Sequence, residues 1–284
     1  MTPLPSPLPD ALLGPVVRSA LLEDFGRAGD VTAAACVEAK ARLKVLFVAR
    51  RAGVVAGLDC ARLALAAMDP DVRFEAVAAD GDRIGAGTVL ARAEGNARAI
   101  LTAERTALNL LGRLSGVATL TAEYVRAVEG TAARITDTRK TTPGLRALEK
   151  YAVRCGGGIN HRFGLDDAIL IKDNHVAACG GVGPALERAK AAAGHLMKVE
   201  VEVDSLEQLD EALPYAPDVI MLDNFSLADL REAVGRAGGK VRLEASGGVS
   251  LETVRAIAET GVDVISVGAL THSAPVLDIG LDAV

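Results

Sequence analysis

The chain has no tryptophan and few other aromatic residues, with five phenylalanines and three tyrosines among 284 residues. Hydrophobic residues still make up 50% of the sequence, so the core has to be built from aliphatic side chains. A groove for single-stranded nucleic acid needs aromatic side chains between basic ones, and this sequence has no such stretch. The formal net charge is −6 and the isoelectric point is near 5.4, so we expect no nucleic-acid partner.

Cysteine is scarce as well, and no two cysteines form a CxxC pair or stand at metal-binding spacing from a histidine. Isolated cysteines in a chain of this length are typical of small buried residues rather than disulfides or a zinc site. Long uninterrupted apolar runs are also missing, so we expect no transmembrane helix and no membrane partner. These features together predict a cytoplasmic protein. The cysteines are Cys36, Cys60, Cys155 and Cys179.

Residues 134–172 carry the most informative charges. They contain eight Lys or Arg residues and four carboxylates, although the chain as a whole is acidic. A local excess of cations in an acidic protein indicates a local anion site. Arg146, Lys150 and Arg154 recur every four residues, which is typical of a solvated helix face with ordinary ion pairs. The remaining cations fit such a face poorly, and we interpret four of them as an anion-binding set: Arg139, Lys140, Arg162 and Lys172.

The second half of the chain repeats a unit of roughly 20 to 25 residues, in which a β-rich apolar run precedes a helix-like segment. The expected strands are residues 133–136, 168–172, 199–204, 219–223, 241–245 and 262–268, and the expected helices are 183–193, 205–213, 226–237 and 250–260. Ser205, Ser226 and Ser250 fit the N-caps of the last three helices. Repeated strand–helix pairs predict a parallel sheet, either open or closed into a barrel.

Polar residues fall at the C-terminal ends of these expected strands, where active sites of parallel α/β folds gather. In residues 198–204 valines alternate with carboxylates, so the two kinds of side chain face opposite sides of the strand. We expect the carboxylates to line the mouth of a barrel. The strand-end residues are Lys172, Glu202, Asp223, Ser246 and Gly268.

Glycine-containing loops follow the last two expected strands, at residues 246–248 and at Gly268. Backbone N–H groups in such loops, together with a helix N-terminus, favour a phosphate group. Many barrels bind phosphate with their last two loops. Glu202 and Asp223 face the same mouth and have four open roles. They can hold ribose hydroxyls, coordinate a magnesium ion between phosphates, stabilise a cationic transition state, or neutralise nearby lysines.

The first 115 residues lack this repeat. Expected strands at 43–49, 54–57, 74–77 and 88–94, with helices at 58–68 and 97–114, predict a small α/β sandwich. Residues 1–10 alternate four prolines and have no basic stretch, which predicts a flexible arm rather than a signal peptide. The expected domains are therefore the arm (1–10), an N-terminal α/β sandwich domain (11–115), an α/β barrel catalytic domain (116–271) and a C-terminal tail (272–284) that returns to the N-terminal domain.

Seven passages carry a resemblance to a known family. They are residues 102–109, 137–144, 157–162, 171–175, 200–204, 222–224 and 244–248. In their order and spacing, across nearly the whole chain, they resemble bacterial quinolinate phosphoribosyltransferase, also called nicotinate-nucleotide pyrophosphorylase (carboxylating). Ala245, where the family often has serine, and the Pro-rich start are minor differences.

The resemblance implies an α/β fold with an N-terminal sandwich domain and an incomplete, TIM-like parallel α/β barrel. The implied reaction converts quinolinate and phosphoribosyl pyrophosphate into nicotinate mononucleotide, pyrophosphate and CO2, in de novo NAD biosynthesis. It implies Mg2+ carried mainly by the phosphoribosyl donor rather than by a protein metal site. It also implies a homodimer, or a higher oligomer, in which Arg105 crosses the interface into the partner's active site.

By motif position the resemblance also implies residue roles. Lys140, Glu202 and Asp223 are the implied catalytic residues. The implied acceptor-binding residues are Arg105, Arg139, His161, Arg162 and Lys172. The implied donor-binding residues are Lys140 for pyrophosphate, Glu202 and Asp223 for ribose, and Ser246, Gly247, Gly248 and Gly268 for the 5′-phosphate. Thr138, Val267 and Ala269 are further implied substrate-binding residues.

Other functions stay open on the residues alone. A related transferase could use nicotinate without decarboxylation, and a relative associated with molybdenum transport shares the fold. A strand-end Lys172 could also form a Schiff base in a sugar-phosphate aldolase. A phosphometabolite-binding regulator is the non-enzyme alternative, although the chain has no recognisable DNA-binding or docking module.

Overall fold

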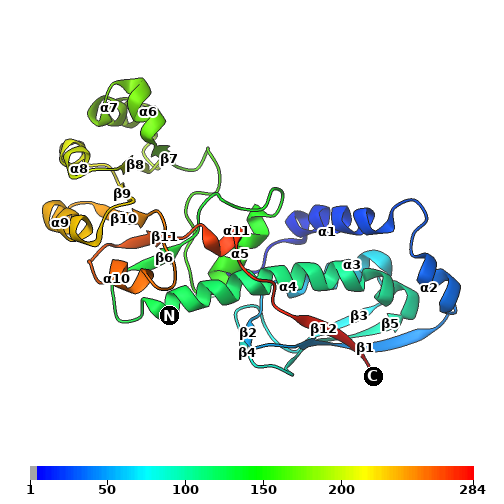
Figure 1. The fold of residues 1–284 in the computed structure, drawn as a ribbon. Coiled ribbons are helices and arrows are strands. Elements are labelled where there is room, and N and C mark those ends of the chain that lie inside the picture. The colour runs from blue at the N-terminus through cyan, green and yellow to red at the C-terminus, as the bar shows by residue number, and fades with distance from the viewer. Residues whose placement is uncertain (1–4) are drawn as a thin grey trace. The chain divides into compact units, whose positions relative to one another are not determined.

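The computed structural model describes residues 5–284, which form two compact units (Figure 1). Unit 1 comprises the residues up to Ala122, Thr141–Gly157 and Leu270–Val284, and unit 2 comprises Glu123–Lys140 and Gly158–Ala269. Residues 141–157 therefore group with the N-terminal unit, whereas the sequence analysis assigned them to the barrel domain. Residues 1–4 of the expected flexible arm lie outside the described residues, and helix α1 (Asp10–Phe25) begins where the expected arm ends.

Unit 1 is built on an antiparallel sheet with strand order β12-β1-β5-β3. The strands are β1 (Arg42–Ala49), β3 (Arg73–Ala76), β5 (Val89–Asn96) and β12 (Ile279–Ala283). β12 pairs with β1 in the register Val45↔Ala283 to Ala49↔Ile279, so the C-terminal residues extend a sheet made by the first hundred residues. A small second sheet pairs β2 (Gly53–Val54) with β4 (Arg83–Ile84).

The helices of unit 1 include elements that the sequence analysis missed. α3 (Leu58–Met68) matches its expected range, and the Asp80 carboxylate caps its start by accepting from the N–H groups of Gly57 and Leu58 at 2.9 and 3.2 Å. The expected helix 97–114 instead continues to Ala127 as α4 (Ala97–Ala127). No prediction covered α1 or α2 (Val31–Cys36).

A buried ion pair organises the part of unit 1 that follows Lys140. Glu149, on α5 (Arg146–Cys155), is 0% exposed and accepts from the Arg113 guanidinium at 2.8 Å. Glu149 also accepts from the backbone N–H and the hydroxyl of Thr142, at 2.9 and 2.8 Å. Arg113 in turn donates to the carbonyls of Thr271 and Ala274. The Arg113–Glu149 pair thus holds both the segment at Thr142 and the segment from Thr271 to Ala274.

The expectation of a solvated stripe on α5 is wrong for Lys150, which is only 3% exposed. Arg146 and Arg154 are partly exposed, and the Arg154 Nε atom is buried. The four-residue spacing correctly predicts a helix. It does not reveal that this helix face packs against the rest of unit 1.

Unit 2 is a six-stranded parallel sheet with strand order β6-β11-β10-β9-β8-β7. Its strands are β6 (Arg134–Thr136), β7 (Ile169–Ile171), β8 (Val199–Val203), β9 (Val219–Asp223), β10 (Arg242–Ser246) and β11 (Val264–Ser266). Strands β7 to β11 follow one another, and β6 returns beside β11, as in a barrel opened between β6 and β7. Ile159 marks the open position with an isolated parallel bridge to Thr136. This arrangement confirms the predicted incomplete barrel.

Helices lie along one side of this sheet (Figure 1), over fully buried residues such as Val201, Ile220 and Leu222. They are α6 (Asp173–Cys179), α7 (Val182–Ala192), α8 (Leu206–Ala212), α9 (Leu227–Ala237) and α10 (Val254–Ala258), with a 3-10 turn at Leu213–Tyr215. Ser205 and Ser226 accept from the N–H groups of Gln208 and Asp229, which confirms these N-caps. The Ser250 cap is wrong, because α10 begins only at Val254 and Thr253 stands at its N-cap.

The described residues include no helix that combines the length and the apolar character needed to cross a membrane. All four cysteines are free; Cys60 and Cys155 are buried as expected, whereas Cys36 is exposed.

We predict that Glu149→Gln lowers the free energy of unfolding by roughly 3 kcal/mol, because it leaves the Arg113 charge without its buried partner. Glu232→Gln is the matched control, since Glu232 pairs with Arg236 on the surface at 3.0 Å and such pairs contribute at most about 1 kcal/mol. Urea unfolding of the wild type and both variants measures the difference. Equal losses in the two variants would contradict a structural role for the buried pair.

Candidate active site

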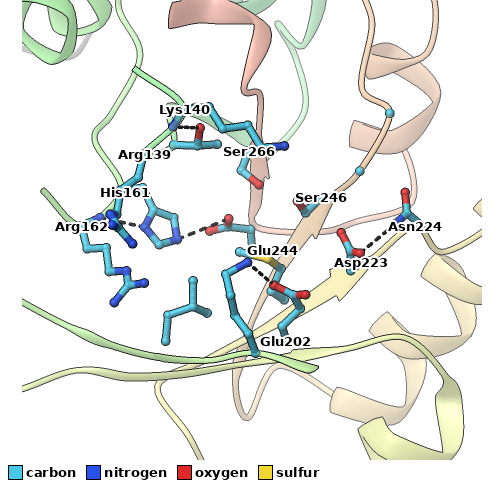
Figure 2. A pocket seen from close by; sticks show the side chains of 16 residues that line it. Arg139, Lys140, His161, Arg162, Glu202, Asp223, Asn224, Glu244, Ser246 and Ser266 are labelled. Atoms are coloured by element: carbon cyan, nitrogen blue, oxygen red, sulfur yellow. Dashed lines mark hydrogen bonds and ion pairs between the residues drawn. The ribbon is translucent and has the colours of Figure 1, made fainter. Parts of the chain in front are cut away.

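A cavity of about 610 Å³ opens in unit 2 at the carboxyl ends of the parallel strands (Figure 2). It brings together most of the predicted site residues, and it also holds residues to which the sequence analysis gave no role. The predicted residues that line it are Thr138, Arg139, Lys140, His161, Arg162, Lys172, Glu202, Asp223, Ser246, Gly247 and Gly248. The additional lining residues are Leu170, Met221, Asn224, Glu244 and Ser266.

Four predicted binding residues do not line this cavity. Val267, Gly268 and Ala269 come directly after the lining residue Ser266, at the end of β11. Arg105 lies on α4 in unit 1, where it is exposed beside a hollow of about 220 Å³ that Glu23, Asp24 and Asn109 also line.

Strand register explains why the carboxylates and the glycine loop meet. Ser246 at the end of β10 pairs with Asp223 at the end of β9, and Glu202 on β8 pairs with Met221 on β9. In parallel strands these register partners lie at the same level, and alternation directs their side chains to the same face.

Asp137 holds the two cationic loops together. It is 0% exposed, and its oxygens accept from the backbone N–H of His161 at 2.9 Å and from the Asn160 side-chain amide at 2.6 Å. The loop that carries Arg139 and Lys140 is thereby tied to the loop that carries His161 and Arg162.

Arg139 and Arg162 present donors that the protein does not satisfy. Their Nε atoms are buried and have no hydrogen-bond partner within residues 5–284. Arg162 also donates from Nη1 to the carbonyl of Ala168 at 3.1 Å. Burial lowers the pKa of Arg162, and the positive charge of nearby Arg139 lowers it further. Two adjacent guanidinium groups with unmet donors form a binding site for an anion with planar oxygen pairs.

Figure 2 shows Arg139, His161 and Arg162 on one side of the cavity, and Ser246, Asp223 and Asn224 on the other. The cavity therefore has a cationic half and a half that offers carboxylate and loop atoms. Lys172 and Glu202 form an ion pair at 2.9 Å, with the Lys172 side chain 48% exposed.

The glycine loop needs glycine at position 247. Gly247 has φ +92°, and a Cβ there would collide with the Asn224 side chain. Asn224 donates its backbone N–H to the Ser246 carbonyl at 2.9 Å and its side-chain amide to Asp223 at 2.7 Å. The loop after β10 thus packs directly on the end of β9, and Ser246, Gly247 and Gly248 line the cavity.

His161, Glu200 and Glu244 form a buried acid cluster. His161 Nε2 is 3.0 Å from a Glu200 oxygen and 3.6 Å from a Glu244 oxygen. His161 Nδ1 accepts from the N–H of Arg162 at 2.8 Å, so the ring proton is on Nε2. Burial raises the pKa of Glu244 to about 7, and the negative charge of Glu200 adds to the shift.

The sequence analysis predicted that His161 binds the acceptor, but the acid cluster already engages its ring. Both ring nitrogens already face protein atoms, so its clearest contribution is to orient the backbone of Arg162. The sequence analysis did not single out Glu244, which stands inside an apolar strand and carries no motif spacing of its own. Its only signal was its place in the passage 244–248.

Comparison with known proteins matches nearly the whole chain to one family. Residues 30–115 match the model of the quinolinate phosphoribosyl transferase N-terminal domain, and residues 117–282 match that of the C-terminal domain. The nicotinate-nucleotide pyrophosphorylase [carboxylating] of Mycobacterium leprae is 51% identical over 271 residues, covering 94% of this chain and 95% of that protein. The probable nicotinate-nucleotide pyrophosphorylase [carboxylating] of Bacillus subtilis is 46% identical over 92% of this chain and 90% of its own.

Solved structures agree with the sequence matches. The nicotinate-nucleotide pyrophosphorylase from Francisella tularensis superimposes with a TM-score of 0.94 at 40% identity, and the match covers 98% of each chain. Both domain models, the curated relatives and the fold therefore lead to one conclusion: the chain belongs to the quinolinate phosphoribosyl transferase family.

Proposed function

We infer that the cavity carries out the reaction of its family, in which quinolinate and phosphoribosyl pyrophosphate give nicotinate mononucleotide, pyrophosphate and CO2, a step of NAD synthesis. The observation that carries this inference is the pair Arg139 and Arg162. Both line a cavity that also holds two strand-end carboxylates and a glycine loop, and the buried Nε atom of each has no hydrogen-bond partner among the described residues. A dicarboxylate acceptor and a phosphorylated sugar donor suit these two halves.

We assign the cationic half to the acceptor. Arg139 and Arg162 bind carboxylate groups of quinolinate through bidentate hydrogen bonds. Lys172 adds a third charge once it leaves Glu202, and Thr138 lines the same half. His161 supports this half through the Arg162 backbone, and its direct contact with the acceptor stays a prediction.

We assign the opposite half to the donor. Lys140 contacts the pyrophosphate, Glu202 and Asp223 contact the ribose, and residues 246–248 contact the 5′-phosphate. Val267, Gly268 and Ala269 complete the phosphate site from the end of the neighbouring strand β11. Support comes from the register that places Ser246 beside Asp223.

The chemistry needs no protein nucleophile, because the pyridine nitrogen of quinolinate attacks the anomeric carbon. Displacement of pyrophosphate develops positive charge on the ribose ring, which Glu202 and Asp223 can stabilise. The ring nitrogen becomes cationic when it is ribosylated. The adjacent carboxylate then leaves as CO2, and a proton takes its place on the ring carbon.

We propose that Mg2+ enters with the donor rather than in a protein cage. At the strand ends the cavity offers Glu202 and Asp223 as hard oxygen groups, but Glu202 is already paired with Lys172. Such a site fits a magnesium ion that is bound mainly by diphosphate oxygens and water. The ion supplies charge neutralisation on the leaving pyrophosphate.

We also propose a homodimer in which Arg105 enters the active site of the partner subunit. Arg105 is exposed on α4, at a hollow of unit 1 that it shares with acidic residues. A local ion pair at that hollow is the alternative role for this arginine.

We predict that Arg139→Ala raises the KM for quinolinate about tenfold or more and changes the donor KM much less, because a charge-assisted contact contributes about 1.5–3 kcal/mol. Steady-state formation of nicotinate mononucleotide measures both constants, with nicotinate tested in place of quinolinate. Arg231→Ala, at an exposed arginine on α9, is the control. Equal changes in the KM of both substrates would contradict the assignment of Arg139 to the acceptor site. An enzyme that turns over nicotinate but not quinolinate would contradict the proposed reaction.

We predict that chelation of Mg2+ abolishes activity. We also predict that Asp223→Asn lowers kcat more than it weakens the binding of donor or Mg2+, because positive charge on the ribose develops only in the transition state. Initial rates over a matrix of Mg2+ and donor concentrations separate these effects. Full activity after exhaustive chelation contradicts the proposed cofactor, and an Asp223→Asn enzyme with normal kcat but weakened Mg2+ binding makes Asp223 a metal ligand instead.

We predict that Arg105→Ala and Lys140→Ala homodimers are each nearly inactive, and that subunit exchange restores up to about a quarter of wild-type activity. Half of the dimers are then mixed, and each has one intact site of two. Mixing Lys140→Ala with Asp223→Asn is the control and should restore nothing, because both residues line the same cavity. No recovery with Arg105→Ala despite confirmed exchange would place Arg105 in its own subunit's site or outside any site.

A further inference from the structure

We propose that Glu244 acts as a neutral carboxylic acid beside His161, in the cavity that Arg139 and Arg162 also line, so that the acid cluster carries one negative charge and leaves the charge of the two arginines available to a dianionic acceptor. Glu244 is thereby a positioning residue that sets the pH range of acceptor binding. This inference rests on the proposed function of the cavity.

The acid cluster supplies few hydrogen-bond donors for two ionised carboxylates. The Ser266 hydroxyl is one donor near Glu244, and it also lies 3.4 Å from the Ala245 carbonyl. His161 offers one proton, on Nε2, which lies 3.0 Å from a Glu200 oxygen, within hydrogen-bond distance. Its distance of 3.6 Å to Glu244 is too long for a hydrogen bond. One oxygen each of Glu200 and Glu244 is buried without a hydrogen-bond partner among the described residues. Two charged carboxylates in such a place are costly, and a proton on Glu244 removes one charge and adds a donor.

The charged and polar groups around Glu244 come from several elements, and most of them favour this proton. Glu200 faces it from β8 and Asp137 from the loop after β6, and both negative charges raise its pKa. His161 and the Ser266 hydroxyl on β11 act in the opposite direction. Burial outweighs these two, since Glu244 is only 4% exposed.

A metal ion is the alternative occupant of the acid cluster, because one ligand atom from each of His161, Glu200 and Glu244 lies within 4.8 Å of the others. Ligation requires a lone pair on His161 Nε2, which moves the ring proton to Nδ1. Nδ1 then opposes the N–H of Arg162 at 2.8 Å, with two donors facing each other. The hydrogen-bond pattern therefore favours a proton over a metal ion.

Binding of the acceptor and the proton on Glu244 are coupled. Ionised Glu244 places another negative charge near the bound carboxylates and partly neutralises the cations that hold them. Linkage then requires that quinolinate binds more tightly when Glu244 is protonated, and that its binding increases proton uptake by the protein. As the pH rises through about 7, Glu244 loses its proton and acceptor binding weakens.

The test compares the wild type with Glu244→Gln, which is neutral at every pH and close in shape. From pH 6.5 to 8.5 we expect the wild-type KM for quinolinate to rise about threefold to tenfold, estimated from the Coulomb energy of nearby charges in a partly screened site. We expect Glu244→Gln to keep the low-pH wild-type value over the whole range. Glu187→Gln, at an exposed residue of α7, should follow the wild type. A Glu244→Gln enzyme that keeps the wild-type pH dependence, or that binds quinolinate poorly at pH 6.5, overturns the role of Glu244.

Calorimetry keeps the inference testable if Glu244→Gln does not fold. Titration of quinolinate into wild-type protein at pH 7.5, in buffers with different ionisation enthalpies, should show net proton uptake. Binding without proton uptake, or a stoichiometric metal ion in the purified wild-type protein, overturns the proposal. A wild-type enzyme that makes no nicotinate mononucleotide at any pH would instead refute the proposed function, so the two failures are distinguishable.

Discussion

The buried carboxylate of Asp137 is the constraint on which the cationic half of the cavity depends. Its two oxygens hold the Asn160 side chain and the His161 backbone, so the loop after β6 and the loop after Ile159 cannot move independently. A fully buried carboxylate is tolerated only when hydrogen bonds replace its hydration. The fold therefore fixes the cations by burying the opposite charge behind them, since guanidinium groups alone would repel one another.

The same principle extends from Asp137 to the acid cluster. Arg139 and Arg162 lie close enough for one to lower the pKa of the other, and Glu200 offsets part of this repulsion. Each added carboxylate stabilises the empty site but also competes with an anionic substrate. If Asp137, Glu200 and Glu244 were all ionised, their negative charges would stabilise Arg139 and Arg162 without substrate and weaken the binding of an anionic substrate. A proton on Glu244 is the simplest way to keep both the buried architecture and the affinity for an anion.

The sequence predicted those parts of the fold that follow from local patterns. The alternating valines and glutamates of β8, the ranges of β9 and α3, and the N-cap serines Ser205 and Ser226 all have short-range causes. The α1 helix was missed because Gly14 and Pro15 are poor helix formers, although the helix continues through both residues. Its buried residues Leu13, Val17 and Leu21 do recur every four positions. The burial of Lys150 and the pairing of Glu200 with His161 depend on segments far apart in the chain. Family motifs located the residues of the cavity, but they could not reveal protonation or tautomer.

Protonation matters because the reaction makes two opposing demands on one set of charges. The ground state is a dianion, which cations must bind, yet a carboxylate held firmly by cations is a poor source of CO2. The site therefore has to concentrate positive charge on the carboxylate that stays and leave the departing one in a less polar place. Cations on long side chains alone distinguish poorly between the carboxylate that stays and the carboxylate that leaves. A neutral Glu244 beside His161 adds no negative charge to the acid cluster, so the positive charge of Arg139 and Arg162 stays available to the carboxylate that they hold. That gives Glu244 a place in the chemistry that motif spacing could not reveal.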